Sequence, residues 1–78
     1  MNDRQEILII IKDVLEKILK REIAEDEYDV KLSYLGLDSL LFTVFLIELE
    51  TVLGGININQ ILESRADTIN RIADGLSI

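Results

Sequence analysis

The sequence contains no cysteine, no histidine and no proline. Without cysteine, neither a disulfide nor a thiolate metal site can form. Without histidine, the chain lacks the commonest general base and the commonest metal ligand. Without proline, no helical pattern is interrupted by a residue that cannot donate a backbone hydrogen bond. The absences weigh against a disulfide scaffold, a metal centre and catalysis by the chain itself.

Basic residues are also few, with 8 Lys and Arg against 15 Asp and Glu and a net charge of −7. This balance excludes the basic footprint that nucleic acid or an anionic membrane surface requires. It favours partners that carry basic patches and are steered by attraction. The longest apolar runs, 7–11 and 44–47, are too short to span a bilayer, and the N-terminal residues show no signal peptide. We therefore expect a cytoplasmic protein.

The sequence is rich in apolar residues, which make up 49% of its 78 positions. We interpret residues 1–78 as a single small domain. A chain of this length buries only about 60% of its unfolded surface, so its stability depends on a dense core of Ile, Leu and Val.

The first predicted helix begins near Asp3, because Asp3 and Glu6 have the spacing of a capping box. Apolar residues then recur at three- and four-residue steps, which is typical of one buried helix face. Ile9 falls off this stripe and is expected to be exposed. The stripe consists of Ile7, Leu8, Ile11, Val14, Leu15, Ile18 and Leu19.

The periodicity fails over residues 22–31, where carboxylates gather. Clustered carboxylates can bind a hard cation. The spacing matches no calcium-loop pattern, however, and no glycine supplies the sharp turn. A solvated acidic loop is the favoured interpretation, with Leu32 and Leu35 anchoring it to the core.

The second predicted helix follows the stretch Leu35-Gly36-Leu37-Asp38-Ser39-Leu40. Asp38 is a good N-cap, and Gly54-Gly55 is a typical helix stop. The helix is apolar nearly all round, which predicts two faces. The face expected in the core consists of Phe42, Phe45, Leu46, Leu49, Val52 and Leu53. The opposite face, expected to be a contact surface, consists of Leu40, Val44 and Ile47, continued by Thr51.

The remaining chain predicts two more helices. Asn57 with Gln60 can cap a short helix that reaches about Glu63, and Asp67 is expected to cap the last one. The apolar residues of that last helix are Ile69, Ile72, Ala73 and Leu76. The predicted fold class is therefore all-α, a small four-helix bundle of three longer helices and one short helix.

Ser39 is the one serine in a suggestive setting. A hydrolytic serine needs a base and oxyanion donors, and with no histidine we expect no catalytic residue and no enzyme activity. Asp38-Ser39 can be a plain helix N-terminus, since both residues are favoured there. Alternatively, a hydroxyl beside the exposed face of Leu40, Val44 and Ile47 is a surface that an enzyme can grip while modifying it.

The stretch Leu35–Leu40 resembles the attachment motif of the acyl and peptidyl carrier protein family. The resemblance covers nearly the whole chain, including the helix order, and Asp67-Thr68-Ile69 with Ala73 resembles the family's usual start of the last helix. It implies that Ser39 is esterified with 4′-phosphopantetheine, taken from coenzyme A by a phosphopantetheinyl transferase. Asp38 would lie beside the phosphodiester and help to place the transferase and its metal, and no resident metal is implied.

The resemblance also implies a discrete carrier that holds acyl or aminoacyl groups as thioesters. Its recognition face would consist of Leu40, Leu41, Val44, Ile47 and Thr51. Carriers of fatty-acid synthesis typically have an acidic second helix, whereas this helix has only Glu48 and Glu50. A polyketide, nonribosomal peptide or related specialised pathway is therefore favoured over housekeeping fatty-acid synthesis.

The expected partners are the transferase, the loading enzymes and downstream biosynthetic enzymes, with no nucleic acid and no membrane, and we expect a monomer. The alternative interpretation is a helical interaction module that carries nothing, in which Asp38-Ser39 is only a helix cap.

Overall fold

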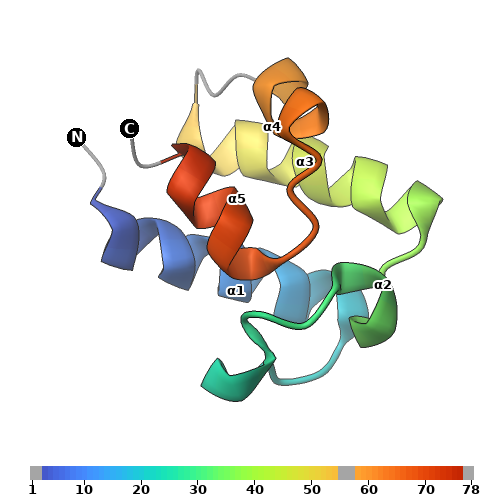
Figure 1. The fold of residues 1–78 in the computed structure, drawn as a ribbon. Helices are drawn as coiled ribbons and strands as arrows, with labels where there is room; N and C mark the ends of the chain where they lie inside the picture. Colours follow the sequence, from blue (N-terminus) through green and yellow to red (C-terminus); the bar gives the residue numbers. More distant parts are fainter. Residues whose placement is uncertain (1–2, 55–57, 77–78) are drawn as a thin grey trace.

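The computed structural model describes residues 3–54 and 58–76, and within these residues it is all-helical, with no strand (Figure 1). The helices are α1 Arg4–Leu19, the 3₁₀ turn η1 Glu25–Glu27, α2 Leu32–Leu35, α3 Ser39–Leu53, α4 Ile58–Ser64 and α5 Ile69–Leu76. The all-α fold class is confirmed, and the helices α1, α3, α4 and α5 correspond to the four predicted ones. The two short elements η1 and α2 were not predicted.

Helix α1 begins where the capping pattern predicts. The Asp3 side chain accepts a hydrogen bond from the Glu6 backbone N–H at 2.9 Å. Every residue of the predicted stripe is buried or half-buried, and Ile9 is 50% exposed. The periodicity therefore assigned the faces of this helix correctly.

The core lies where α1 packs against both α3 and α5 (Figure 1). Its largest fully buried side chains come from all three helices, and each contributes about 1.5–3 kcal/mol by leaving water. They are Ile7, Ile11, Leu15, Phe45, Leu49, Ile69 and Ile72. No helix among the described residues combines the length and the apolar character needed to cross a membrane.

The acidic segment after α1 is held to the fold by its backbone. Ile23 is buried, and its N–H donates to the Glu16 carboxylate at 2.8 Å. The Ala24 backbone N–H at 3.0 Å and the Arg21 guanidinium at 2.7 Å donate to the Glu27 carboxylate. Both interactions hold the pKa of Glu27 below the usual value for glutamate. The expected loop thus contains a turn of 3₁₀ helix, η1, that closes on its own carboxylate.

Leu32 and Leu35 are buried, with 3% and 8% exposure, which confirms them as anchors of the preceding segment. They form the ends of the four-residue helix α2. Asn70 of α5 ties the same segment to the bundle, because its N–H donates to the Tyr28 carbonyl and its side chain donates to Asp29.

The cap of α5 differs from the prediction. Thr68, and not Asp67, precedes the helix, and its hydroxyl accepts a hydrogen bond from the Arg71 backbone N–H at 3.1 Å. The carbonyl of Asp67 instead accepts the Leu32 N–H at 2.8 Å. Both residues are good caps in isolation, and this contact to a distant segment decides between them. The predicted cap at Asn57 lies outside the described residues.

Gly36 ends α2 and sets the direction of the chain toward α3. Its φ of +109° is a conformation that side-chain-bearing residues rarely adopt. The Gly36 N–H donates to the Ser33 carbonyl at 3.3 Å, and the Leu37 N–H donates to the Leu32 carbonyl at 3.0 Å. This pair of hydrogen bonds is a Schellman motif, and Leu32 and Leu37, which it brings together, are both buried. At the C-terminal end of α3, Gly54 ends the helix as predicted. The Gly54 N–H donates a hydrogen bond to the Glu50 carbonyl at 2.8 Å.

We predict opposite effects for two Gly→Ala substitutions. A Cβ on Gly36 would meet Leu19 at an ordinary 3.6 Å, so the cost of Gly36→Ala is backbone strain, about 1–2 kcal/mol. Gly75→Ala, inside α5 with nothing within 4 Å, should be neutral or should stabilise the domain by up to about 1 kcal/mol. Urea denaturation of both variants measures the difference, and equal effects would contradict the role assigned to the Gly36 turn.

Candidate functional site

Ser39 is the first residue of α3 and follows the Gly36 turn by three residues. Leu37 is buried, Asp38 is extended, and the Asp38 carboxylate accepts the Leu41 N–H at 2.9 Å. The predicted N-cap is therefore confirmed. Ser39 itself is exposed, and its hydroxyl has no hydrogen-bond partner among the described residues. The local sequence thus leaves a free hydroxyl at the start of a long helix.

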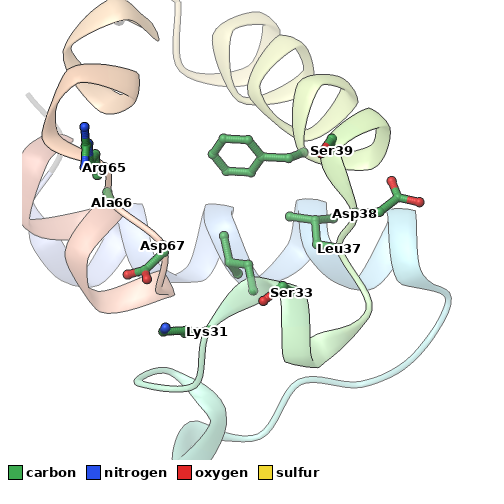
Figure 2. Close-up of a pocket in the computed structure, with 10 residues that line it drawn as sticks. Lys31, Ser33, Leu37, Asp38, Ser39, Arg65, Ala66 and Asp67 are labelled. Carbon is green, nitrogen blue, oxygen red and sulfur yellow. The ribbon is translucent and has the colours of Figure 1, made fainter.

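An open pocket of about 630 Å³ lies beside Ser39 (Figure 2). Three segments line it: the start of α2, the nearby residues around Ser39, and the connector from α4 to α5, which is distant from both in the sequence. The hydrogen bond from the Leu32 N–H to the Asp67 carbonyl joins the first and the last of these segments. The lining residues are Lys31, Leu32, Ser33, Leu37, Asp38, Ser39, Phe42, Arg65, Ala66 and Asp67.

Four charged residues line this pocket, and they differ in their partners. Asp38 caps α3, and Asp67 pairs with Arg71 at 3.3 Å. Lys31 and Arg65 have no ion-pair partner in the described part of the chain. Sequence reasoning did not single out either cation, because no local pattern links positions that meet only through the fold.

The outer face of α3 is exposed as the two-face pattern predicts. Leu40 is 73% exposed, Ile47 56% and Val44 39%. Thr51 is exposed, and its hydroxyl donates to the Ile47 carbonyl at 3.0 Å. Leu41 is half-buried and packs partly against the core. Four of the five residues predicted for recognition therefore share one accessible face, and Leu41 lies at its edge.

The inner face of α3 matches the prediction except at one position. Phe45, Leu46 and Leu49 are buried, and Phe42 and Leu53 are half-buried against them. Val52, which periodicity assigns to the core, is 54% exposed. It lies in the last turn of the helix, where periodicity does not tell whether a neighbouring element covers the side chain.

Few free carboxylates remain along α3. Glu48 is half-buried and pairs with Lys17 of α1 at 3.4 Å. Glu50 is exposed near the end of the helix. Helix α3 therefore has one exposed carboxylate, that of Glu50, and it lies far along the helix from Ser39.

The site fits a phosphate-linked group. The N-terminus of α3 offers backbone N–H groups and a positive dipole end, which favour a phosphate. The Ser39 hydroxyl is accessible and unpartnered, and the pocket beside it has a volume in the usual range for bound organic groups. Among the described residues, no three His, Cys, Asp or Glu side chains are grouped closely enough to hold a metal ion.

A short all-helical domain that presents a serine at a helix start beside an open pocket is the architecture of a carrier domain. The family model of the phosphopantetheine attachment site matches residues 10–76. The chain therefore belongs to this family, and the domain is a site of covalent 4′-phosphopantetheine attachment. No curated protein and no solved structure matches the chain. Family membership confirms the resemblance seen in the sequence.

Membership has two general consequences. Domains of this family are generally carriers and not catalysts. A carrier domain also interacts with a phosphopantetheinyl transferase and with biosynthetic enzymes.

We predict that the α3 cap depends on an acceptor oxygen at position 38 and not on its charge. Asp38→Ala should lower the free energy of unfolding by about 1 kcal/mol, because the Leu41 N–H loses its acceptor. Asp38→Asn, which keeps an acceptor at the same place, should retain most of that stability. Denaturation curves of both variants test this prediction, and an equal loss in the two would contradict it.

Proposed function

We propose that Ser39 is the residue that receives the 4′-phosphopantetheine arm. The observation that carries this proposal is the position of its hydroxyl: exposed, unpartnered among the described residues, and at the first residue of α3 beside the pocket. Ser33 also lines the pocket but lies inside the short helix α2. Of the two serines that line the pocket, only Ser39 stands at the start of a long helix, where the dipole favours a phosphate.

The neighbouring residues prepare this position. Asp38 fixes the first turn of α3 and places a carboxylate next to the hydroxyl, where it is available to the transferase and its metal. The buried Leu37 and the Gly36 turn hold the backbone before it. When bound, the arm supplies a thiol that holds acyl or aminoacyl groups as thioesters, a group that a chain without cysteine lacks.

We further propose a discrete, monomeric, cytoplasmic carrier for a specialised pathway, of the polyketide, nonribosomal peptide or a related kind. The pairing of Glu48 with Lys17 supports this choice, because it leaves α3 with an apolar outer face and few free acids. Such a face favours enzymes that dock by hydrophobic contact over enzymes that recognise an acidic helix.

The outer face of α3 is the proposed docking surface for the transferase and for the loading and downstream enzymes. Leu40, Val44 and Ile47 supply apolar area next to Ser39, and Thr51 extends the face along the helix. Leu41 contributes only its exposed part. The protein itself performs no catalysis and is acted upon by these enzymes.

The attachment residue is tested by intact mass. Wild-type protein incubated with coenzyme A and a broad-specificity phosphopantetheinyl transferase should gain one phosphopantetheinyl group. Ser39→Ala should gain none, because the acceptor oxygen is gone. Ser33→Ala is the matched control, since Ser33 lines the same pocket, and it should be modified like the wild type.

Two results would count against the proposal. An unmodified wild-type chain would favour the alternative, a helical interaction module whose Asp38-Ser39 is only a cap. Full modification of Ser39→Ala would move the attachment point elsewhere. Asp38→Asn isolates the proposed role of the carboxylate, and it should slow modification while leaving the fold intact.

The docking surface is tested on the same helix. Val44→Asp and Ile47→Asp should slow modification by the transferase several-fold and change the free energy of unfolding by less than about 1 kcal/mol, since both side chains are exposed. Leu46→Asp is the contrasting variant, because Leu46 is 4% exposed and a buried carboxylate should cost several kcal/mol. Thermal unfolding distinguishes the two classes, and strong destabilisation by Val44→Asp would show that the outer face is part of the core.

A further inference from the structure

We propose that the pocket beside Ser39 holds the carboxylate of an anionic acyl cargo, with Lys31 and Arg65 as its partners. The inference rests on the proposed attachment at Ser39 and adds a class of cargo to it. It starts from two positively charged residues of the pocket, Lys31 and Arg65, which are far apart in the sequence and meet only in the fold.

Most basic residues of this chain have an ion-pair partner among the described residues. Of its 8 basic residues, five form the ion pairs found among the described residues, namely Arg4, Lys12, Lys17, Arg21 and Arg71. Lys20, Lys31 and Arg65 remain without such a partner, although acidic residues outnumber basic ones nearly two to one. Two of these three line the same pocket, next to the proposed attachment residue.

The acids of the pocket do not neutralise these cations. Asp67 is paired with Arg71, and Asp38 accepts the Leu41 N–H. In Figure 2 the Asp38 carboxylate points away from the pocket. Among the described residues, the pocket therefore has two cations without an ion-pair partner and two carboxylates that each accept a hydrogen bond from another group.

The position of the two cations indicates that they bind the cargo and not the arm. In Figure 2, Arg65 lies across the pocket from Ser39, and Lys31 lies lower in the view, also away from Ser39. The phosphate of an arm attached to Ser39 stays next to the serine oxygen, and the pantetheine portion beyond it is uncharged. An anion that reaches the far side therefore belongs to the group carried on the thiol.

The apolar lining of the pocket, between Ser39 and the two cations, suits a short carbon chain. Leu32, Leu37, Phe42 and Ala66 line the pocket and supply apolar surface. An apolar path that ends at Lys31 and Arg65 matches an acyl group with a carboxylate at its far end. Short dicarboxylic acyl groups have this chemistry.

The test compares cargo pairs of equal shape and different charge. Unmodified carrier is loaded from malonyl- or isovaleryl-coenzyme A, and from succinyl- or 4-methylpentanoyl-coenzyme A, with a broad-specificity transferase. In each pair a carboxylate replaces an isopropyl group. Intact mass confirms loading before melting temperatures are measured, so a failure to load counts against the proposed function and not against this inference.

In the wild type, at least one carboxylated form should melt higher than its neutral partner by roughly 2–5 °C, the shift expected for a weak ion pair in a domain of this size. The difference should shrink in Lys31→Gln and in Arg65→Gln and vanish in the double variant. Lys20→Gln is the matched control, because Lys20 is unpaired but lies outside the pocket, and it should keep the full difference. Comparing two cargoes on the same variant removes any effect of the substitution on the fold.

Three results would overturn the inference. Both pairs could melt alike in the wild type. The difference could persist in the double variant. Lys31→Gln and Arg65→Gln could also shift the carriers with neutral cargo as much as those with charged cargo, which would assign the cations to the phosphodiester of the arm.

Discussion

The turn at Gly36 is the constraint on which the position of Ser39, the proposed attachment residue, depends. A backbone with φ of +109° lets the Gly36 and Leu37 N–H groups reach back to the carbonyls of α2, and this reversal buries Leu32 and Leu37 together. Asp38 then leaves the turn extended and caps α3, so Ser39 has little freedom in where it begins the helix. The same two leucines line the pocket, so one turn fixes both the serine and part of the cavity wall.

Helix α3 serves two surfaces at once. Its inner face supplies Phe45 and Leu49 to the core that α1 and α5 complete. Its outer face remains apolar and exposed, although that exposure does nothing for the stability of the isolated domain. In a small domain a long helix cannot be covered on every side, and the uncovered side lies directly next to Ser39. The ion pair between Glu48 and Lys17 ties one of the few acidic residues of α3 to α1, so that this acid is not a free charge on α3.

Charge is distributed unevenly around the proposed attachment site. The chain carries a net charge of −7, yet its pocket contains two cations that have no ion-pair partner among the described residues, and two carboxylates that accept hydrogen bonds from other groups. The wall that contains Arg65 is the connector between α4 and α5, which the Leu32–Asp67 backbone hydrogen bond holds against the start of α2. The geometry of the cationic side therefore depends on backbone contacts far from Ser39 in the sequence.

The structure departs from the sequence-based expectations at a few particular residues. Asp67 and Thr68 are equally plausible caps by composition, and the contact of Asp67 with Leu32 left the role to Thr68. Val52 fits the core periodicity but lies in a last turn where it remains exposed. The helix α2 is too short to produce a periodic signal. In each case the information was absent from the local sequence.

The sequence by itself determined the helices, their buried faces and the motif around Ser39, because caps, glycine turns and apolar periodicity act within a few residues of one another. It also identified the family, since the attachment motif is a contiguous stretch. The tertiary structure alone decided which residues meet Ser39 across the pocket. Lys31 and Arg65 lie far apart in the chain, and only the packing of α2 against the α4–α5 connector brings both to one cavity, where neither has an ion-pair partner in the part of the chain that the structure describes.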